Sequence, residues 1–168
     1  VRSAAELMFD TPSVLARLEG TGTVSVETAA QIGLVGLAAR ASGLDRDIRR
    51  ESPYGIYRLT HLPVCTWDTG DCFARAYVRW LEVQQSLEFI REQLDALPGG
   101  PIASPAKPIA PNQMVVSLTE GWRGEICHVV QTDGHGRFAV VKAVDPSLHN
   151  WFGLAMALRD GQISDFPL

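Results

Sequence analysis

Residues 70–97, with the sequence GDCFARAYVRWLEVQQSLEFIREQLDAL, constrain the fold of this chain more than any other segment. Their apolar side chains recur at steps of three, four or seven residues, a spacing that gathers them on one side of an α-helix. At 1.5 Å per residue, such a helix is roughly 40 Å long. The apolar positions are Phe73, Tyr77, Trp80, Leu81, Leu87, Ile90, Leu94 and Leu97. The pattern predicts one long helix that forms the backbone of the fold and ends at Pro98-Gly99-Gly100.

The residues before this helix predict short elements. Thr11-Pro12 is a typical helix start, and the helix that follows it is expected to end at Gly20. Ser25 is suited to cap a second short helix that runs through Ile32. Glycines at 33, 36 and 43 then interrupt an alanine-rich stretch, which predicts a compact and irregular segment. For residues 53–61 we expect a weak strand or a loop.

Beyond the long helix the pattern changes. Five prolines between 98 and 111 predict an extended linker over 98–112. Runs rich in β-branched residues at 114–118, 125–131 and 137–143 then predict a small antiparallel sheet, whose last two strands are joined by Thr132-Asp133-Gly134-His135-Gly136. Asp145-Pro146 starts a final helix, which Gly161 is expected to end. The predicted fold class is α+β, mainly α, with a helical part over 1–97, the linker, and a sheet with a helix over 113–168, all in one compact piece.

Charge and hydropathy exclude two classes of partner. The net charge is −4 and no run of five lysines or arginines occurs, so we expect no nucleic-acid binding. No window contains the roughly 18 uninterrupted apolar residues of a membrane span, and no secretory leader is visible, so the chain is expected to be soluble and unexported. It begins on Val1 without a methionine and stops soon after apolar residues. We therefore expect a piece of a larger subunit.

The cysteines do not predict a metal centre or a thiol enzyme. There are three, with no CxxC pair, and the spacing of His61, Cys65 and Cys72 matches no common zinc pattern, with or without His128. We predict no metal site made by this chain alone. Cys72 falls in the first turn of the long helix, yet an isolated cysteine is more often a small buried apolar residue than a nucleophile. No glycine-rich phosphate-binding motif is present.

Arg123 is the residue most suggestive of function. It lies between Trp122 and Gly124, with Glu120 and Glu125 close by in sequence. Spacing alone favours an Arg–Glu clamp that orders the start of a strand, and the alternative is a guanidinium committed to a functional site. On the long helix, Arg79 and Glu82 are three residues apart and are expected to be able to pair.

Five blocks of sequence occur in a recognisable order. They resemble the large subunit of the membrane-associated, energy-converting nickel–iron hydrogenases, including formate hydrogenlyase, and its relative in respiratory complex I, the 49-kDa subunit. The resemblance covers most of residues 19–168 and implies a piece from the C-terminal half of such a subunit, with a long helical bundle and a small β element. The blocks are EGTGTVSVETAAQIGLVGLAARASGLDRDIRR at 19–50, PYGIY at 53–57, GDCFARAYVRWLEVQQSLEFI at 70–90, EGWRGEICH at 120–128 and DPSLHNWFGLAMALRDGQISDFPL at 145–168.

The resemblance implies roles for particular residues. Arg123 matches the arginine of a Glu-Ala-Pro-Arg-Gly motif that, in the hydrogenases, donates hydrogen bonds to the diatomic ligands of the bimetallic centre. This chain has Gly121-Trp122 where Ala-Pro is common. Glu120 and Glu125 are expected to support the cavity or its ion pairs. Polar family positions on the long helix match Asp71, Arg75, Arg79 and Glu82, and a segment near the small-subunit contact and the cavity matches Arg40, Asp45 and Arg49.

The resemblance also implies cofactors and partners. The family binds its metals with two CxxC pairs, and neither pair occurs in these 168 residues. We therefore expect no cofactor in this chain, with a nickel–iron centre possible in the full-length parent. The alternative parent is a metal-free, quinone-linked subunit like that of complex I, or a scaffold subunit. The expected partners are an iron–sulfur small subunit and membrane-arm subunits, and the expected location is the cytoplasm, peripheral on the inner face of the membrane.

Overall fold

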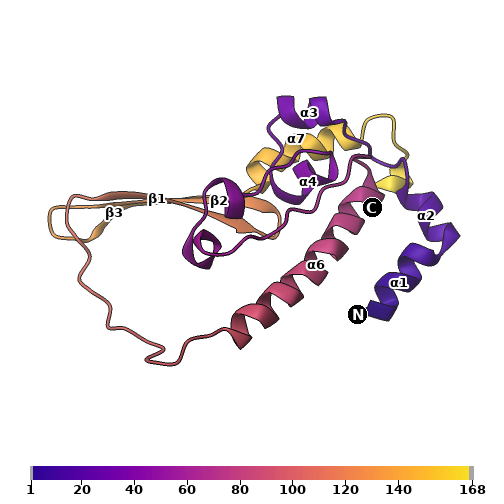
Figure 1. Ribbon diagram of the computed structural model, residues 1–168. Helices are drawn as coiled ribbons and strands as arrows, with labels where there is room; N and C mark the ends of the chain where they lie inside the picture. Colours follow the sequence, from indigo (N-terminus) through magenta and orange to yellow (C-terminus); the bar gives the residue numbers. More distant parts are fainter. Residues whose placement is uncertain (1, 167–168) are drawn as a thin grey trace.

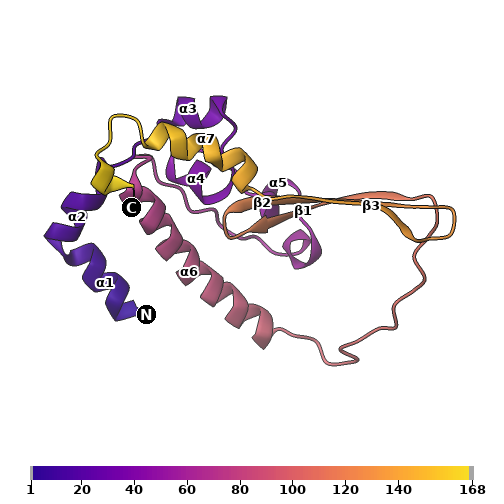
Figure 2. The same ribbon diagram turned by 180° about the vertical axis from the view of Figure 1, so that it is seen from behind.

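The computed structural model describes residues 2–166 and combines seven α-helices and two 3-10 turns with one three-stranded antiparallel sheet (Figure 1). This confirms the predicted α+β class. The helices α2, α3, α4 and α7 lie near the start of the long helix α6, α5 lies beside the sheet, and the sheet extends away from the other helices (Figures 1 and 2). The elements are α1 (Arg2–Asp10), α2 (Pro12–Leu18), α3 (Val26–Gln31), α4 (Gly36–Ala41), α5 (Ile48–Glu51), η1 (Gly55–Arg58), α6 (Cys72–Asp95), β1 (Met114–Gly121), β2 (Gly124–Thr132), β3 (Phe138–Val144), α7 (Ser147–Ala157) and η2 (Ile163–Asp165).

The long helix is confirmed, and the sequence before it explains where it starts. Asp71 is its N-cap, because the side-chain Oδ1 accepts a hydrogen bond of 2.8 Å from the backbone N–H of Ala74. The other carboxylate oxygen of Asp71 accepts from the N–H of Gly20 at 2.8 Å, which joins the end of α2 to the start of α6. Asp71 therefore has a structural task at the helix N-terminus.

The apolar stripe of α6 is buried only in the first half of the helix. Ala74 and Val78 are fully buried and pack with Leu37, Ala41 and Cys65 in one core cluster. The second half protrudes, and Leu94 exposes 64% of its surface. Periodicity predicted the helix correctly, but the described chain supplies no element that covers its far end.

The predicted short helices α2 and α3 are present. Ser25 caps α3 as expected, with its hydroxyl accepting from the N–H of Thr28 at 3.2 Å. A second core cluster around Val24, Ala29 and Leu34 receives Met156 and Ala157 of α7, so the final helix is packed against the N-terminal part of the chain. The expected weak strand or loop at 53–61 instead contains the 3-10 turn η1.

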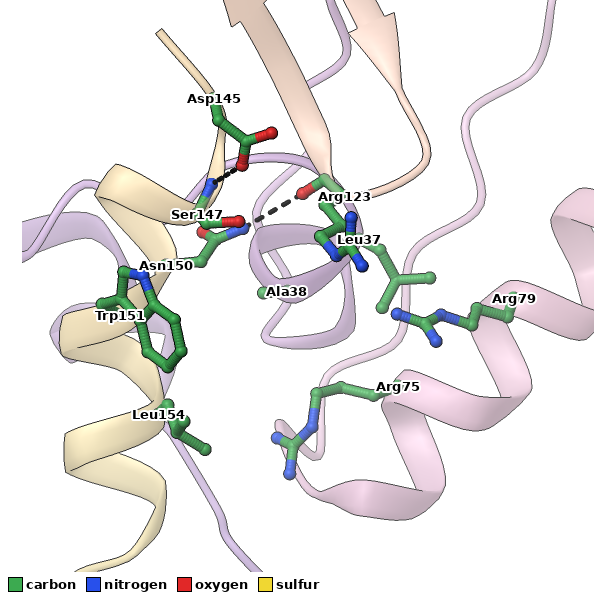
Figure 3. Close-up of a pocket in the computed structure, with 10 residues that line it drawn as sticks. All are labelled: Leu37, Ala38, Arg75, Arg79, Arg123, Asp145, Ser147, Asn150, Trp151 and Leu154. Carbon is green, nitrogen blue, oxygen red and sulfur yellow. Dashed lines mark hydrogen bonds between the residues drawn. The ribbon is translucent and has the colours of Figure 1, made fainter. Parts of the chain in front are cut away.

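The sheet has the order β1-β2-β3, and both pairings are antiparallel as predicted. Glu120 pairs with Glu125 and Gly121 with Gly124, so Trp122 and Arg123 form the tip of the hairpin between β1 and β2. This hairpin tip is the end of the sheet that meets α4 and α7 (Figures 1 and 3). Among the helices of residues 2–166, none is long and apolar enough to cross a membrane.

Candidate functional site

A cavity of about 620 Å³ lies between α4, α6, α7 and the β1–β2 hairpin tip (Figure 3). Three guanidinium groups line it, those of Arg75, Arg79 and Arg123, and we call it the guanidinium pocket. Its other lining residues are Leu37, Ala38, Asp145, Ser147, Asn150, Trp151 and Leu154. The pocket thus combines a cationic wall from α6 and the hairpin tip with an apolar wall from α4 and α7.

Arg75 belongs partly to the architecture. Its Nη1 donates to the carbonyl oxygens of Gly22 and Gly70 at 3.1 and 2.9 Å, and its Nη2 donates to the Sγ of Cys72 at 3.0 Å. These bonds connect the loop before α3 to the start of α6. These acceptors are neutral groups, so they do not neutralise the positive charge that Arg75 contributes to the pocket lining.

Arg79 is held by an aromatic ring. Its guanidinium carbon lies 5.3 Å from the centre of the Trp122 ring, within the range of a cation–π contact. Burial and, after it, the charge of Arg123 lower the pKa of Arg79. The predicted pairing of Arg79 with Glu82 is wrong, because Glu82 pairs with Arg40 instead. Like charges are therefore close together in this pocket.

The predicted Arg–Glu clamp at Arg123 is also wrong. Glu120 pairs with Arg40, and Glu125 lies 3.9 Å from the guanidinium of Arg46. Within residues 2–166, neither Arg79 nor Arg123 forms an ion pair or a side-chain hydrogen bond. Asp145 is the one acidic residue in the lining, and its Oδ1 accepts from the N–H of Ser147 at 2.8 Å.

The hairpin tip that carries Arg123 is seated directly on α4. Gly36 has a φ of +61° and Gly124 a φ of +131°, conformations that favour glycine. A Cβ added at Gly36 would lie 2.6 Å from the carbonyl oxygen of Arg123, and one added at Gly124 would lie 2.9 Å from the Cα of Gly36. Two glycine backbones thus meet without a side chain between them, which fixes the hairpin tip at the pocket edge.

Behind the hairpin tip lies a buried ionic cluster centred on Arg40, which is 1% exposed. Its Nε is 2.7 Å from Glu82 of α6, and its Nη1 is 2.9 Å from Glu120 of β1 and 3.5 Å from Asp47. Burial opposes the charge of Arg40, but Glu82 and Glu120 outweigh that effect and raise its pKa. Burial raises the pKa of Glu120, although Arg40 acts in the opposite direction. The cluster joins α4, α5, α6 and β1.

The remaining predicted site residues lie beside this cluster. Arg49 pairs with Asp47, which is nearly as buried as Arg40. Asp45 is exposed and pairs with Arg50 at 2.9 Å. Arg40 itself is enclosed by its own chain and offers no surface to another polypeptide. A second cavity of about 310 Å³ adjoins Arg40, Arg49, Glu82 and Glu120, and it shares no described lining residue with the guanidinium pocket.

Sequence reasoning missed Asn150. Its side chain joins α7 to the residue before α4 and to the hairpin tip, and it lines the guanidinium pocket. The available signal was one amide residue inside the otherwise apolar sequence LHNWFGLAMAL of the final helix. A polar side chain at such a position requires hydrogen-bond partners from another element.

The cysteines lie in ordinary structural positions. Cys65 is buried and its Sγ lies 3.0 Å from the Oε1 of Gln85, while Cys72 is buried at the start of α6. No group of three or more histidine, cysteine or acidic residues in the described chain is arranged to hold a metal ion. The guanidinium pocket is therefore the site with the most distinctive chemistry.

We expect Cys65 to be alkylated slowly. Burial and the nearby carboxylate of Glu82 raise the pKa of its thiol, so the reactive thiolate is scarce at neutral pH. Its iodoacetamide reaction, followed by peptide mass spectrometry, should be at least roughly 10-fold slower than that of free cysteine. Reaction as fast as free cysteine would instead support a thiol enzyme.

Comparisons with known proteins show which proteins this chain resembles. Residues 1–114 match the family model described as the 49 Kd subunit of respiratory-chain NADH dehydrogenase. The carbon monoxide-induced hydrogenase of Rhodospirillum rubrum is 34% identical over 157 residues, which cover 94% of this chain and 44% of that protein. A subunit of the F(420)H(2) dehydrogenase of Methanosarcina mazei is 32% identical over 154 residues, covering 87% of this chain and 41% of that protein.

A further relative is a subunit of the NADH-quinone oxidoreductase of Rhizobium etli, which is 42% identical over 101 residues, covering 60% of this chain and 25% of that protein. The chain thus spans less than half the length of the curated relatives that it matches. All three are named as oxidoreductases or as subunits of them. On the strength of the family match, the chain belongs to the family of the 49-kDa subunit of respiratory-chain NADH dehydrogenase.

Proposed function

We propose that this chain is part of the large subunit of a membrane-associated, hydrogenase-like redox complex of the formate hydrogenlyase type. Its guanidinium pocket would face a redox group held by the rest of that subunit. The observation that supports this proposal is the state of the arginines. The buried Arg40 and the partly buried Arg49 are paired with carboxylates, whereas the exposed Arg79 and Arg123 line a cavity without an ionic partner in the described part of the chain.

Arg79 and Arg123 are both exposed in this chain, and unpaired guanidiniums at the edge of a pocket favour an anionic or electron-rich neighbour. They are permanently charged donors that need no proton transfer, and they would be most effective where other polypeptide covers the pocket and excludes water. Arg123 would act as an outer-sphere donor, and Arg79 would keep the local potential positive. Glu120 and Glu82 support the site from behind through Arg40.

The described residues do not fit the coordination of a nickel–iron centre. They contain no metal-binding cluster, and the two buried cysteines interact with Gln85 and Arg75. Any such centre in the parent protein would depend on ligands from other polypeptide. We accordingly propose that this chain donates hydrogen bonds to the redox group and shapes part of its cavity, and that it supplies no metal ligand.

An iron–sulfur small subunit and membrane-arm subunits are the proposed partners, with the complex on the cytoplasmic face of the membrane. Two relatives are named as subunits of larger oxidoreductases, which supports a multisubunit setting. Exposed apolar side chains on the far half of α6 and on α7, such as Leu94 and Trp151, are surfaces that other polypeptide would cover.

The proposal predicts a large loss of activity when Arg123 is changed in the full-length subunit within its purified complex. Arg123→Gln should reduce hydrogen-dependent reduction of methyl viologen by about 10²- to 10³-fold, because a preorganised donor is lost. Arg123→Lys should retain more activity, since it keeps the charge but not the planar fork. Arg137→Gln, at the opposite end of the sheet, is the control and should behave as the wild type. Wild-type activity in the Arg123→Gln complex would overturn the role of the pocket.

The second candidate is a metal-free, quinone-linked subunit, which the family match and the NADH-quinone oxidoreductase relative favour. The two candidates differ in metal content and in substrate. A hydrogenase-like parent should contain about one nickel per large subunit and oxidise hydrogen. A complex-I-like parent should contain none and reduce decylubiquinone, and the flanking sequence should then lack the two CxxC pairs.

A further inference from the structure

The side-chain amide of Asn150 connects three segments that meet at the guanidinium pocket. Its Oδ1 accepts a hydrogen bond of 3.1 Å from the backbone N–H of Val35, directly before α4. Its Nδ2 donates a hydrogen bond of 3.0 Å to the carbonyl oxygen of Arg123 (Figure 3). One planar group on α7 therefore satisfies a donor and an acceptor on two different elements.

The platform that carries Asn150 is itself closely packed. Gly153, one turn further along α7, faces Leu34 so closely that an added Cβ would lie 2.6 Å from the Cδ2 of Leu34. Gly36 and Gly124 make the matching close contact on the other side of Val35. The amide thus lies between two tight contacts that hold α7, α4 and the hairpin tip in one register.

The guanidinium of Arg123 has no comparable restraint of its own. Its side chain forms neither an ion pair nor a hydrogen bond with the residues that the structure describes, and its carbonyl is held by Asn150. The backbone of the hairpin tip therefore sets the position and the Cα–Cβ direction from which this side chain starts.

We propose that Asn150 is a positioning residue for Arg123: the bond from its Nδ2 to the Arg123 carbonyl fixes the backbone from which the guanidinium enters the pocket. This inference rests on the proposed function of Arg123. Asparagine suits the task, because an amide provides both the donor and the acceptor that the two backbone groups require. Aspartate would keep the acceptor for Val35 and would place an oxygen against the Arg123 carbonyl.

The first test is a double-mutant cycle in the purified complex, in whichever assay the wild type supports, hydrogen-dependent viologen reduction or decylubiquinone reduction. Asn150→Ala should lower kcat roughly 10- to 100-fold with little change in KM, because a misdirected catalytic group slows the reaction after substrate is bound. Asn150→Asp should be impaired at least as much. In the Arg123→Gln background, Asn150→Ala should reduce activity by less than about 2-fold.

The second test needs no activity. Hydrogen–deuterium exchange of the complex should show faster exchange in residues 121–124 for Asn150→Ala, with residues 132–137 at the far turn and 74–82 of α6 unchanged. His149→Ala is the matched control, because its side chain forms no hydrogen bond within residues 2–166, and it should change neither exchange nor kcat.

The outcomes separate the two proposals. If Arg123→Gln has no effect on activity, the proposed function fails. If Arg123→Gln is impaired but Asn150→Ala lowers activity equally in both backgrounds, or leaves exchange at 121–124 unchanged, Asn150 is not a positioning residue.

Discussion

Replacing Arg40 with alanine should reduce the free energy of unfolding by about 3–5 kcal/mol, because the change removes one partner from a buried ionic cluster. Glu82, Glu120 and Asp47 all lie within 3.5 Å of this guanidinium. Without it, three carboxylates remain in a poorly hydrated region with Arg49 as the remaining nearby cation. Urea denaturation followed by circular dichroism measures the loss.

The cost comes from the carboxylates left behind rather than from the strength of any single pair. Burial already raises the pKa of Glu120 while Arg40 is present. A carboxyl group whose pKa is raised in the folded state destabilises that state at pH values above its unfolded pKa. The Arg40→Ala variant should therefore recover part of its stability as the pH is lowered toward the range in which Glu120 takes up a proton.

Arg50→Ala is the appropriate comparison. Arg50 pairs with Asp45 at 2.9 Å, a good distance, but both side chains are exposed. An exposed pair contributes about 0–1 kcal/mol, so this variant should be close to the wild type. Equal losses in the two variants would mean that the Arg40 cluster is hydrated and contributes no more than a surface pair.

Gly36→Ala should cost about 2–5 kcal/mol, the sum of an unfavourable backbone conformation and an overlap with other backbone atoms. The φ of +61° is disfavoured for alanine. The new methyl group would lie 2.6 Å from both the Arg123 carbonyl oxygen and the Gly124 nitrogen, which belong to a paired hairpin and cannot turn aside. The hairpin tip must therefore move away from α4.

Gly33→Ala separates the two contributions. Gly33 has a similar φ of +71°, but no atom lies within 4 Å of a Cβ added there. It should lose only the conformational part, about 1–2 kcal/mol. Thermal unfolding compares the two variants. A Gly36→Ala variant no less stable than Gly33→Ala would show that the contact between α4 and the hairpin tip yields easily.

The sequence predicted the elements of this fold better than their contacts. The helix α6 and the strands follow from periodicities of three to four and of two, which are local properties. The ion pairs were also predicted from neighbouring residues in the sequence, and those predictions were wrong. Arg79 and Glu82 are neighbours on one helix, yet Glu82 pairs with Arg40, which is 42 positions away.

Burial explains this outcome. Arg40 lies inside the chain and requires carboxylates, whereas Arg79 has the exposed face of Trp122 to cover it. Glu120 likewise pairs with Arg40, which is 80 positions away, and so does not pair with its sequence neighbour Arg123. These partners are set by how α4 packs on α6 and on the hairpin, and spacing along the sequence contains no such information. The family resemblance singled out Arg123 as a candidate site residue, whereas neither it nor the spacing of residues singled out Asn150.

The uncovered far half of α6 has a practical consequence for work with this polypeptide. A helix that presents a row of leucine and isoleucine side chains to water tends to seek the same surface on another copy. We therefore expect the chain to self-associate and precipitate when it is produced by itself. Co-production with the polypeptide that shields this row is the sound route to material for biochemistry.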